Sequence, residues 1–441
     1  MKVDLNILSP VRRKVDVELP AEVVDEEFSR VCGSLSQRAR IKGFRPGKIP
    51  RTVLQGVYGD EIKSRVLSQL VDQTLREVFK EKGLQVVAQP EVEAQGLTEG
   101  QAFSFSAVVE VKPDFDVGNY LGLELEQAKQ SVKDEQVEET LRRLQEARAR
   151  LEPVEGREVV ERGDCVLIDF TGSIEGKPFS GNKGENYLLE VGGGNAVTDF
   201  ENGLVGLNKG VEHSMRVAYP EDYFNREMAG KSVDFLVTAR EIKKKILQPL
   251  DDEFAKDHGE SGSLAELKQK IRDQLETELR EIRKRGLKAQ ILTRLIDGHT
   301  FEIPSTLVDQ EIRYLMRRYQ SAAASSSPGQ AEGGPSTEEL RKELEPQARR
   351  SVQGSLLVEK ISALEGIQVS DQDLQRRIDE SIRLARDQGT QLREIYGRAE
   401  VREELRSQMV YDRTLDYLVE RAAIKEVEPE KTKVDEQGKK R

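Results

Sequence analysis

The chain of 441 residues is too long for one ordinary hydrophobic core, so several domains are expected. Charged residues make up 34% and apolar residues 37%, a composition that favours helices with broad solvated faces over one dense globule. The formal net charge of -11 excludes a chain that is basic throughout, so any surface for a polyanion must be a local patch.

Targeting and redox signals are sparse. The start, MKVDLNILSPVRRKVDVELP, lacks the basic and apolar regions of a signal peptide, and no stretch approaches the ~18 apolar residues of a membrane helix. Cys32 and Cys165 have no CxxC spacing, which argues against a disulfide framework and a cysteine zinc site. These patterns predict a cytoplasmic protein.

Residues 1–112 combine two periodicities. Val15, Val17 and Leu19 alternate with charged residues, which predicts a strand of a hairpin, and alternation returns over residues 103–111. Between them, apolar residues recur at helical spacing up to about Lys42 and again from Arg51 to Gly83. The pattern predicts an α+β domain, in which a small antiparallel sheet lies beside two long helices.

The rest of the chain divides into four further segments that differ in composition and in the spacing of apolar residues. Residues 113–151 read as a connector with a helix in its second half, and residues 152–246 as short strands with many glycines. Residues 247–425 read as charged helices, and residues 426–441 are polar enough that we expect disorder. The predicted class is therefore multidomain α+β, with an antiparallel β domain that contains a short helix and an all-α C-terminal domain.

Motifs for acid-base, metal or ATP chemistry are missing from the sequence. Its three histidines, His213, His258 and His299, lie in no HExxH or His/Cys cluster, and there is no GxSxG nucleophile motif. The segment GSIEGKP, residues 172–178, has the wrong spacing for a phosphate loop. We therefore expect no metal and no cofactor.

The β-rich segment holds an unusual share of the aromatic residues in an aromatic-poor chain. These aromatic residues are either the core of the segment or partly the lining of a pocket, and residue type alone leaves both open. The aromatic positions, with one valine among them, are Phe170, Phe179, Tyr187, Val197, Phe200, Tyr223 and Phe235.

This segment resembles an FKBP-type peptidyl-prolyl isomerase domain. The resemblance is carried by VLIDFTG, GKPF, YLLEVGGGNAVTDFENGLVGLNKG, YPEDY and VDFLV between residues 166 and 237. It implies that these seven side chains, with Ala196, form an apolar pocket for a prolyl ring. Two positions depart from the usual family pattern, because Ser180 replaces an acidic residue and Asp199 replaces a glycine.

The C-terminal helices offer candidate surfaces for unfolded chains. Tyr314, Leu315, Met316 and Tyr319 lie within EIRYLMRRYQ, amid dense charge. Met and aromatic side chains adapt to varied partners, so these residues are candidate substrate contacts, and helix packing is the alternative.

The segment RARIKGFRPGKIPR, residues 38–51, is basic and uninterrupted by acidic residues. In an acidic chain it indicates a polyanionic partner, either RNA or an acidic protein surface, and a solvated helix connection is the alternative. Within it, GFRPGKIP matches the GFRxGKxP signature of the trigger factor family, and the order of segments behind it is similar to that family from end to end.

The resemblance implies an ATP-independent, ribosome-associated chaperone that holds nascent chains open at the tunnel exit and isomerises prolyl bonds. Its implied partners are an exit-site ribosomal protein, nearby ribosomal RNA, and nascent or unfolded polypeptides, with roles in folding, export and cell division. Its implied ribosome-binding residues are Gly43, Phe44, Arg45, Gly47, Lys48 and Pro50. The sequence leaves open a homodimer off the ribosome.

Two alternatives to this reading stay open on the residues alone. One is a free-standing prolyl isomerase with domains that recruit clients, and the other is an RNA-binding protein with a non-catalytic FKBP-like module.

Overall fold

The structure is a computed structural model. It describes residues 1–42, 44–45, 47–94, 96–179, 181–221, 223, 225, 227–257, 261–326, 336–385 and 389–428, and only the backbone over 322–326. The chain separates into two compact units, one formed by Met1–Ala128 with Lys284–Arg441 and the other by Lys129–Arg283. No helix within these described ranges has the length and apolar character needed to span a membrane.

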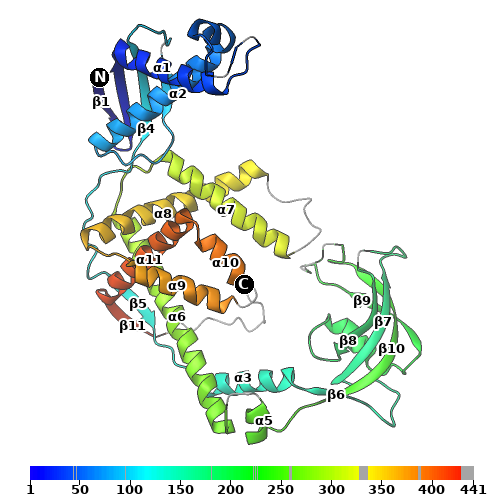
Figure 1. Cartoon of the computed structure of the whole chain (residues 1–441). Helices are drawn as coiled ribbons and strands as arrows, with labels where there is room; N and C mark the ends of the chain where they lie inside the picture. The colour runs from blue at the N-terminus through cyan, green and yellow to red at the C-terminus, as the bar shows by residue number, and fades with distance from the viewer. Residues whose placement is uncertain are drawn as a thin grey trace. The chain divides into compact units, whose positions relative to one another are not determined.

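The N-terminal part of the first unit is built on an antiparallel sheet in the order β1-β2-β4-β3 (Figure 1). Its strands are β1 Lys2–Ser9, β2 Arg12–Leu19, β3 Glu91–Ala94 and β4 Phe103–Glu110. In β2 and β4 alternate residues are buried, as period-2 patterning requires when one face of a sheet meets a core.

Two long helices supply the other half of this core. They are α1 Ala21–Arg38 and α2 Arg51–Glu81. Pro20 and Pro50 precede them as extended N-cap residues, a position that their fixed φ angle allows. The apolar stripes of both helices pack on the sheet, with Phe28, Leu54 and Phe105 among the buried residues. The predicted hairpin, helix pair and returning strand are thus all present.

The C-terminal helices of the first unit enclose separate small cores. They are α7 Ser305–Ser326, α8 Thr337–Leu364, α9 Asp371–Leu384, α10 Gly389–Tyr396 and α11 Ala399–Glu420, with the second half of α6 Leu264–Gly298. Ile291, Leu357 and Leu415 are buried together in one core, and Val308, Ile312 and Ala348 in another.

A strand near the C-terminus differs from expectation. Strand β11 Ala423–Val427 pairs in parallel with β5 Glu124–Ala128 of the connector. The predicted disordered tail therefore begins too early, because Glu426 and Val427 belong to this strand. The prediction rested on the polarity of the segment, but pairing between backbones needs no apolar side chain. The partner strand, β5, lies about 300 residues away in the sequence, so composition could not reveal it. The rest of that prediction, over 429–441, lies outside the described residues.

The second unit holds two structures. Helix α3 Asp134–Ala147 packs through Val137 and Leu141 against α5 Asp252–Asp257 and the first half of α6. The other structure is an antiparallel sheet, strongly curved in Figure 1, in the order β6-β10-β7-β8 with β9 on β10. Its elements are β6 Arg150–Pro153, β7 Asp164–Ser173, β8 Lys183–Glu190, α4 Thr198–Leu204, β9 Glu212–Ala218 and β10 Ser232–Ile246. Phe200 and Leu204 of α4 enter the core of this sheet.

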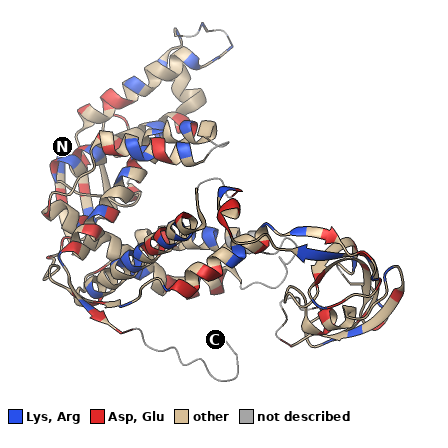
Figure 2. Ribbon diagram, turned by 90° about the horizontal axis from the view of Figure 1, so that it is seen from below, with Lys and Arg blue, Asp and Glu red and all other residues tan. Residues whose placement is uncertain are grey.

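The fold-class prediction is confirmed. The chain combines an α+β part, an antiparallel β part with a short helix, and a helical part. Residues of both charge signs are distributed along the helices, as the colours of the ribbon in Figure 2 show.

Candidate functional site

The centre of the β part is a cluster of three phenylalanine rings. Phe170 comes from β7, Phe200 from α4 and Phe235 from β10. Their ring centroids are 6.2 Å apart for Phe170 and Phe200, 6.0 Å for Phe170 and Phe235, and 5.1 Å for Phe200 and Phe235. All three pairs meet edge to face, the arrangement that aromatic quadrupoles favour.

Two strand glycines make room for these rings. A β-carbon on Gly172 would lie 2.8 Å from the ring of Phe235 and 3.0 Å from that of Phe179. A β-carbon on Gly184 would overlap the ring of Phe170. Neither glycine was among the predicted site residues, although an isolated glycine within a strand pattern is a known sign of close approach.

The remaining predicted pocket residues lie around this centre. Phe179, Ala196, Val197 and Tyr223 are half-buried and pack on the same core. Tyr187 is 50% exposed, and its ring stands perpendicular to that of Phe170 at 5.9 Å. The structure thus gathers all seven predicted side chains around one apolar cluster, some of them still open to solvent.

A hydrogen bond between β7 and β8 lies next to Tyr187 in the sequence. The backbone N–H of Asn186 donates to Oδ1 of Asp169 at 2.8 Å, and Asn186 has a positive φ of 53°. The pairing of β7 with β8 is irregular at this point, between Ile168 and Phe170. Such bulges redirect side chains beside functional sites, and here the next residue is Tyr187.

The two tyrosines that pack against the cluster, Tyr219 and Tyr223, are kept neutral by burial. Burial raises the pKa of Tyr219 to about 12, and burial followed by the proximity of Tyr187 raises the pKa of Tyr223. Both phenols are therefore neutral at pH 7. Asp199 is exposed on α4, and Ser180 lies outside the described residues.

Such a site can catalyse rotation without breaking a covalent bond. The barrier of an X-Pro bond, roughly 18–20 kcal/mol, comes from amide resonance. An apolar wall that holds the prolyl ring and keeps water from the carbonyl favours the twisted state, in which charge separation is smaller.

The loop between α1 and α2 is the second candidate site. The backbone N–H of Gly47 donates to Ser36 O at 2.8 Å, that of Lys48 to Arg45 O at 3.0 Å, and that of Phe44 to Ile41 O at 3.1 Å. Gly47 has a φ of 82°, which only glycine adopts at low cost. Of the other predicted ribosome-binding positions, Pro50 is the N-cap of α2, and Gly43 lies outside the described residues.

The loop presents Phe44 and two cations to solvent. Phe44 is 40% exposed, while Ile49 of the same loop is buried in the core of the N-terminal part. Arg45 and Lys48 are exposed and form no ion pair with any residue that the structure describes. Arg51 behaves differently, because it pairs with Glu99 and donates to Ser29 Oγ at 3.3 Å. Arg51 is therefore a cation of segment 38–51 whose charge is already engaged within the protein.

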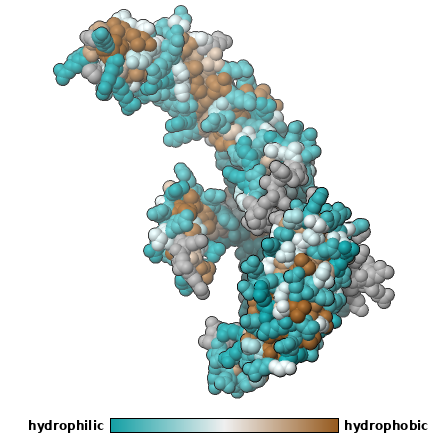
Figure 3. Space-filling model, turned by 90° about the vertical axis from the view of Figure 1, so that its right-hand side faces the viewer, coloured by the Kyte–Doolittle hydropathy of each residue, from teal (hydrophilic) through white to brown (hydrophobic). Residues whose placement is uncertain are grey.

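The four candidate residues on α7 fall into two classes. Tyr314 and Tyr319 are 48% and 49% exposed, and Arg318 lies 5.9 Å from the ring of Tyr314. Leu315 and Met316 are half-buried and pack on the core formed by Val308, Ile312 and Ala348. On the face drawn in Figure 3, apolar groups likewise form small patches among polar ones.

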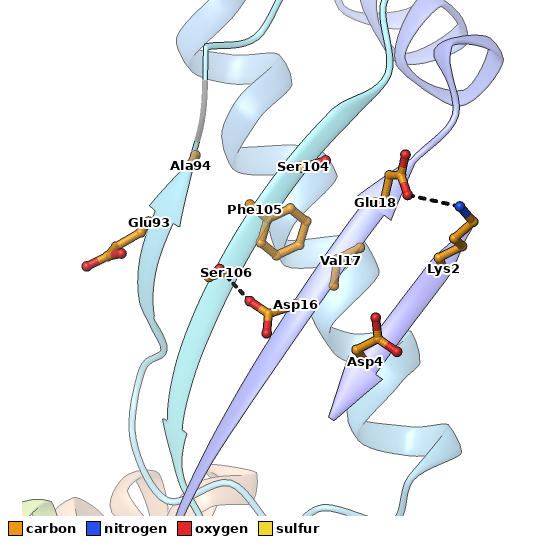
Figure 4. A pocket seen from close by; sticks show the side chains of 10 residues that line it. All are labelled: Lys2, Asp4, Asp16, Val17, Glu18, Glu93, Ala94, Ser104, Phe105 and Ser106. Carbon is orange, nitrogen blue, oxygen red and sulfur yellow. Dashed lines mark hydrogen bonds and ion pairs between the residues drawn. The ribbon is translucent and has the colours of Figure 1, made fainter. Parts of the chain in front are cut away.

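An acidic hollow of about 520 Å³ lies on the N-terminal sheet (Figure 4). Asp16 accepts a hydrogen bond from Ser106 at 2.6 Å, and Glu18 pairs with Lys2 at 3.4 Å. Asp4 and Glu93 add two further carboxylates to its lining. Within the described ranges, no group of three or more His, Cys, Asp or Glu residues is placed to hold a metal ion.

Three family models cover most of the chain. Residues 1–144 match the bacterial trigger factor protein (TF), residues 156–239 match FKBP-type peptidyl-prolyl cis-trans isomerase, and residues 263–420 match the bacterial trigger factor C-terminus.

Curated relatives match this chain over nearly its whole length. The trigger factor of Syntrophotalea carbinolica is 33% identical over 98% of this chain and 98% of its own. That of Geotalea uraniireducens is 33% identical over 97% of this chain and 99% of its own.

One solved structure is similar in fold. It is reported as "Promiscuous Substrate Recognition in Folding and Assembly Activities of the Trigger Factor Chaperone", with a TM-score of 0.53 and 22% identity over 95% of this chain and 99% of that one. The family models and full-length relatives lead to one conclusion. The chain belongs to the trigger factor family, the ribosome-associated chaperones that carry an FKBP-type peptidyl-prolyl isomerase domain.

Proposed function

We propose that this chain docks on the ribosome through the loop at residues 43–50 and there holds nascent chains without ATP. The docking proposal rests on the exposed Phe44 and on Arg45 and Lys48, which form no ion pair with any residue that the structure describes. The loop that carries them is tied to α1 by the hydrogen bond from the Gly47 N–H to Ser36 O. A loop already shaped before contact loses less entropy on binding. Phe44 then anchors in an apolar cleft, as buried aromatic residues do in interface hot spots.

The partners at this contact are an exit-site ribosomal protein and the ribosomal RNA beside it. Arg45 can grip a carboxylate or a phosphate through two parallel hydrogen bonds, and Lys48 adds a second positive charge. The acidic hollow on the sheet is a poor surface for RNA, because Asp4 and Glu93 add negative charge there beyond the two carboxylates, Asp16 and Glu18, that are paired with lysines. The distribution of charge in residues 1–112 thus favours contact with a polyanion through the loop and not through the hollow on the sheet. Such a ribosome-bound protein works in the cytoplasm.

The pocket of Phe170, Phe179, Tyr187, Val197, Phe200, Tyr223 and Phe235 binds proline-containing segments of the same nascent chains. The edge-to-face cluster supports this role, because it combines a rigid apolar floor with partly exposed walls. Tyr314 and Tyr319 on α7 are further substrate contacts, since both remain exposed. Leu315 and Met316 contribute less, because they are already packed in a core.

We also propose the division of labour along the chain. Residues 1–112 bind the ribosome, residues 113–151 connect, residues 152–246 isomerise prolyl bonds, and residues 247–425 hold substrates. The packing of α3 against α5 and α6, and the pairing of β5 with β11, support a connector that is tied to the helical part of the chain.

Co-sedimentation with ribosomes tests the docking proposal. Replacing Phe44, Arg45 and Lys48 by Ala should weaken ribosome binding about a hundredfold, the scale of one lost hot spot, and leave prolyl isomerisation of a short peptide unchanged. A control replaces Ile7, Lys2 and Arg12, an exposed apolar residue and two ion-paired cations on the sheet, and so removes the same number of positive charges away from the loop. Ribosome binding retained by the loop variant, or lost equally in the control, would refute docking through this loop.

A further inference from the structure

The wall of the aromatic pocket next to α4 is formed by a loop rich in glycine. Residues 191–197, VGGGNAV, join the end of β8 at Glu190 to the start of α4 at Thr198. Gly192 and Gly194 have φ angles of 87° and 76°, a conformation that other residues rarely adopt. Three successive glycines give a chain much conformational freedom. Something must hold this loop if Ala196 and Val197 are to present a fixed surface.

The carboxylate of Glu201 holds it. This side chain is only 4% exposed, and its two oxygens accept backbone hydrogen bonds from the loop. Oε1 accepts the N–H of Ala196 at 2.9 Å, and Oε2 accepts the N–H of Gly194 at 3.2 Å. Among the residues that the structure describes, no Lys or Arg forms an ion pair with it. Backbone N–H dipoles of the loop face this buried charge, as they do in anion-binding nests.

The ionisation of Glu201 is consistent with this role. Burial acts to raise the pKa of the carboxyl group, but backbone hydrogen bonds from Ala196, Gly194, Gly192 and Asn195 outweigh burial and lower it. The group is therefore charged at pH 7, and its oxygens act purely as acceptors. A neutral side chain of the same shape cannot serve all these donors.

Glu201 also connects the pocket floor to this wall. It follows Phe200 in α4, and the backbone N–H groups of Phe200 and Glu201 both bond to Val197 O, at 2.8 Å and 3.1 Å. One turn of helix thus presents the Phe200 ring to the pocket and the Glu201 carboxylate to the loop. The spacing between floor and wall depends on both contacts.

We propose that Glu201 is a positioning residue for prolyl binding, acting by holding loop 192–196 in the shape that substrate requires. This inference rests on the proposed pocket. Without the charge, the loop must be ordered anew in each binding event, so substrate binding pays that entropy. The wall contacts the prolyl segment before and during rotation. Its loss therefore raises KM and leaves kcat nearly unchanged, as loss of uniform binding does.

The test uses the full chain with Glu201→Gln and Glu201→Ala. Gln keeps the size of Glu but turns an NH2 group toward backbone donors. We expect KM for a proline-containing peptide to rise about tenfold, the scale of one hydrogen bond to a charged group, with kcat within about twofold. Amide hydrogen exchange should speed up at residues 192–196 and not in β7 or β10. Glu201→Asp, which keeps the charge, should restore part of the protection.

A control variant separates positioning from general stability. Leu207→Ala removes a side chain buried in the same core, so it should lower stability without a selective change in the loop or in KM. An unchanged KM in Glu201→Gln, or exchange that rises everywhere as in Leu207→Ala, would overturn the inference. If the parent chain shows no isomerase activity, the proposed pocket fails. The exchange measurement then still decides whether Glu201 orders the loop.

Discussion

The ring of Phe170 on β7 lies directly against the backbone of Gly184 on β8, where there is no room for a β-carbon. The two residues are register partners in the sheet. Phe170 is also the ring that contacts Tyr187, Phe200 and Phe235 edge to face. The position of the central pocket ring therefore depends on a glycine that itself contributes no side chain.

Gly184→Ala should displace the Phe170 ring and lower kcat/KM for prolyl isomerisation by about tenfold or more, because misplaced groups lose oriented contacts with the transition state. Peptide isomerisation assays of the full chain would measure this. Gly286→Ala is the control, since this helical glycine has open space around its β position. That variant should keep full activity and gain about 0.5–1 kcal/mol of stability from the lower backbone entropy of Ala. Equal activity in both variants would contradict the assigned role of Gly184.

Phe235→Ala should abolish most isomerase activity, because it removes the ring nearest to Phe200. A Phe to Ala change in a core costs about 3–5 kcal/mol, so activity must be compared at a temperature where circular dichroism shows the fold intact. Ile242→Ala, at a buried position on the same strand β10, is the matched control for lost core volume. A comparable loss of activity in both variants would mean that stability, and not the pocket, explains the effect.

The stability of the β part should fall at high pH through Tyr219. Burial raises the pKa of this phenol to about 12, whereas an exposed Tyr has a pKa of ~10. The native state therefore keeps its proton where the unfolded state has lost it. The free energy of unfolding should decrease as pH rises from about 10 to about 12. Urea unfolding across this range would measure the slope, and Tyr219→Phe should reduce it; an identical slope in that variant would exclude Tyr219 as the cause.

Glu99→Gln tests whether Arg51 is structural. Glu99 pairs with Arg51 and also accepts a hydrogen bond from Gln55 at 2.7 Å. Both partners are partly exposed, so losing the pair should cost at most about 1 kcal/mol in urea unfolding. Ribosome binding should not weaken, because Arg51 is held by Glu99 in the parent chain and does not contact a ribosomal phosphate there. A marked loss of binding would show that the Glu99 contact shapes the docking loop, whereas Lys48→Ala is expected to weaken binding directly.

The sequence by itself determined the class of each segment. Alternation around Val15 and helical spacing after Pro20 are local consequences of which face meets a core, so they could be read without a structure. The loop signature and the aromatic residues between Phe170 and Phe235 were equally visible, because their chemistry lies in residue type. These patterns were sufficient for the fold class and the family.

Only the tertiary structure decided which residues support the two sites. Gly184 meets Phe170 across two strands, Glu99 neutralises Arg51 from 48 residues away, and β11 pairs with β5 across most of the chain. Glu201 lies close in sequence to its loop, yet an acidic residue on a helix is usually solvated, so its burial could not be foreseen. Each of these roles depends on which residues the folded backbone places in contact with one another, and residue type and spacing in the sequence do not carry that information.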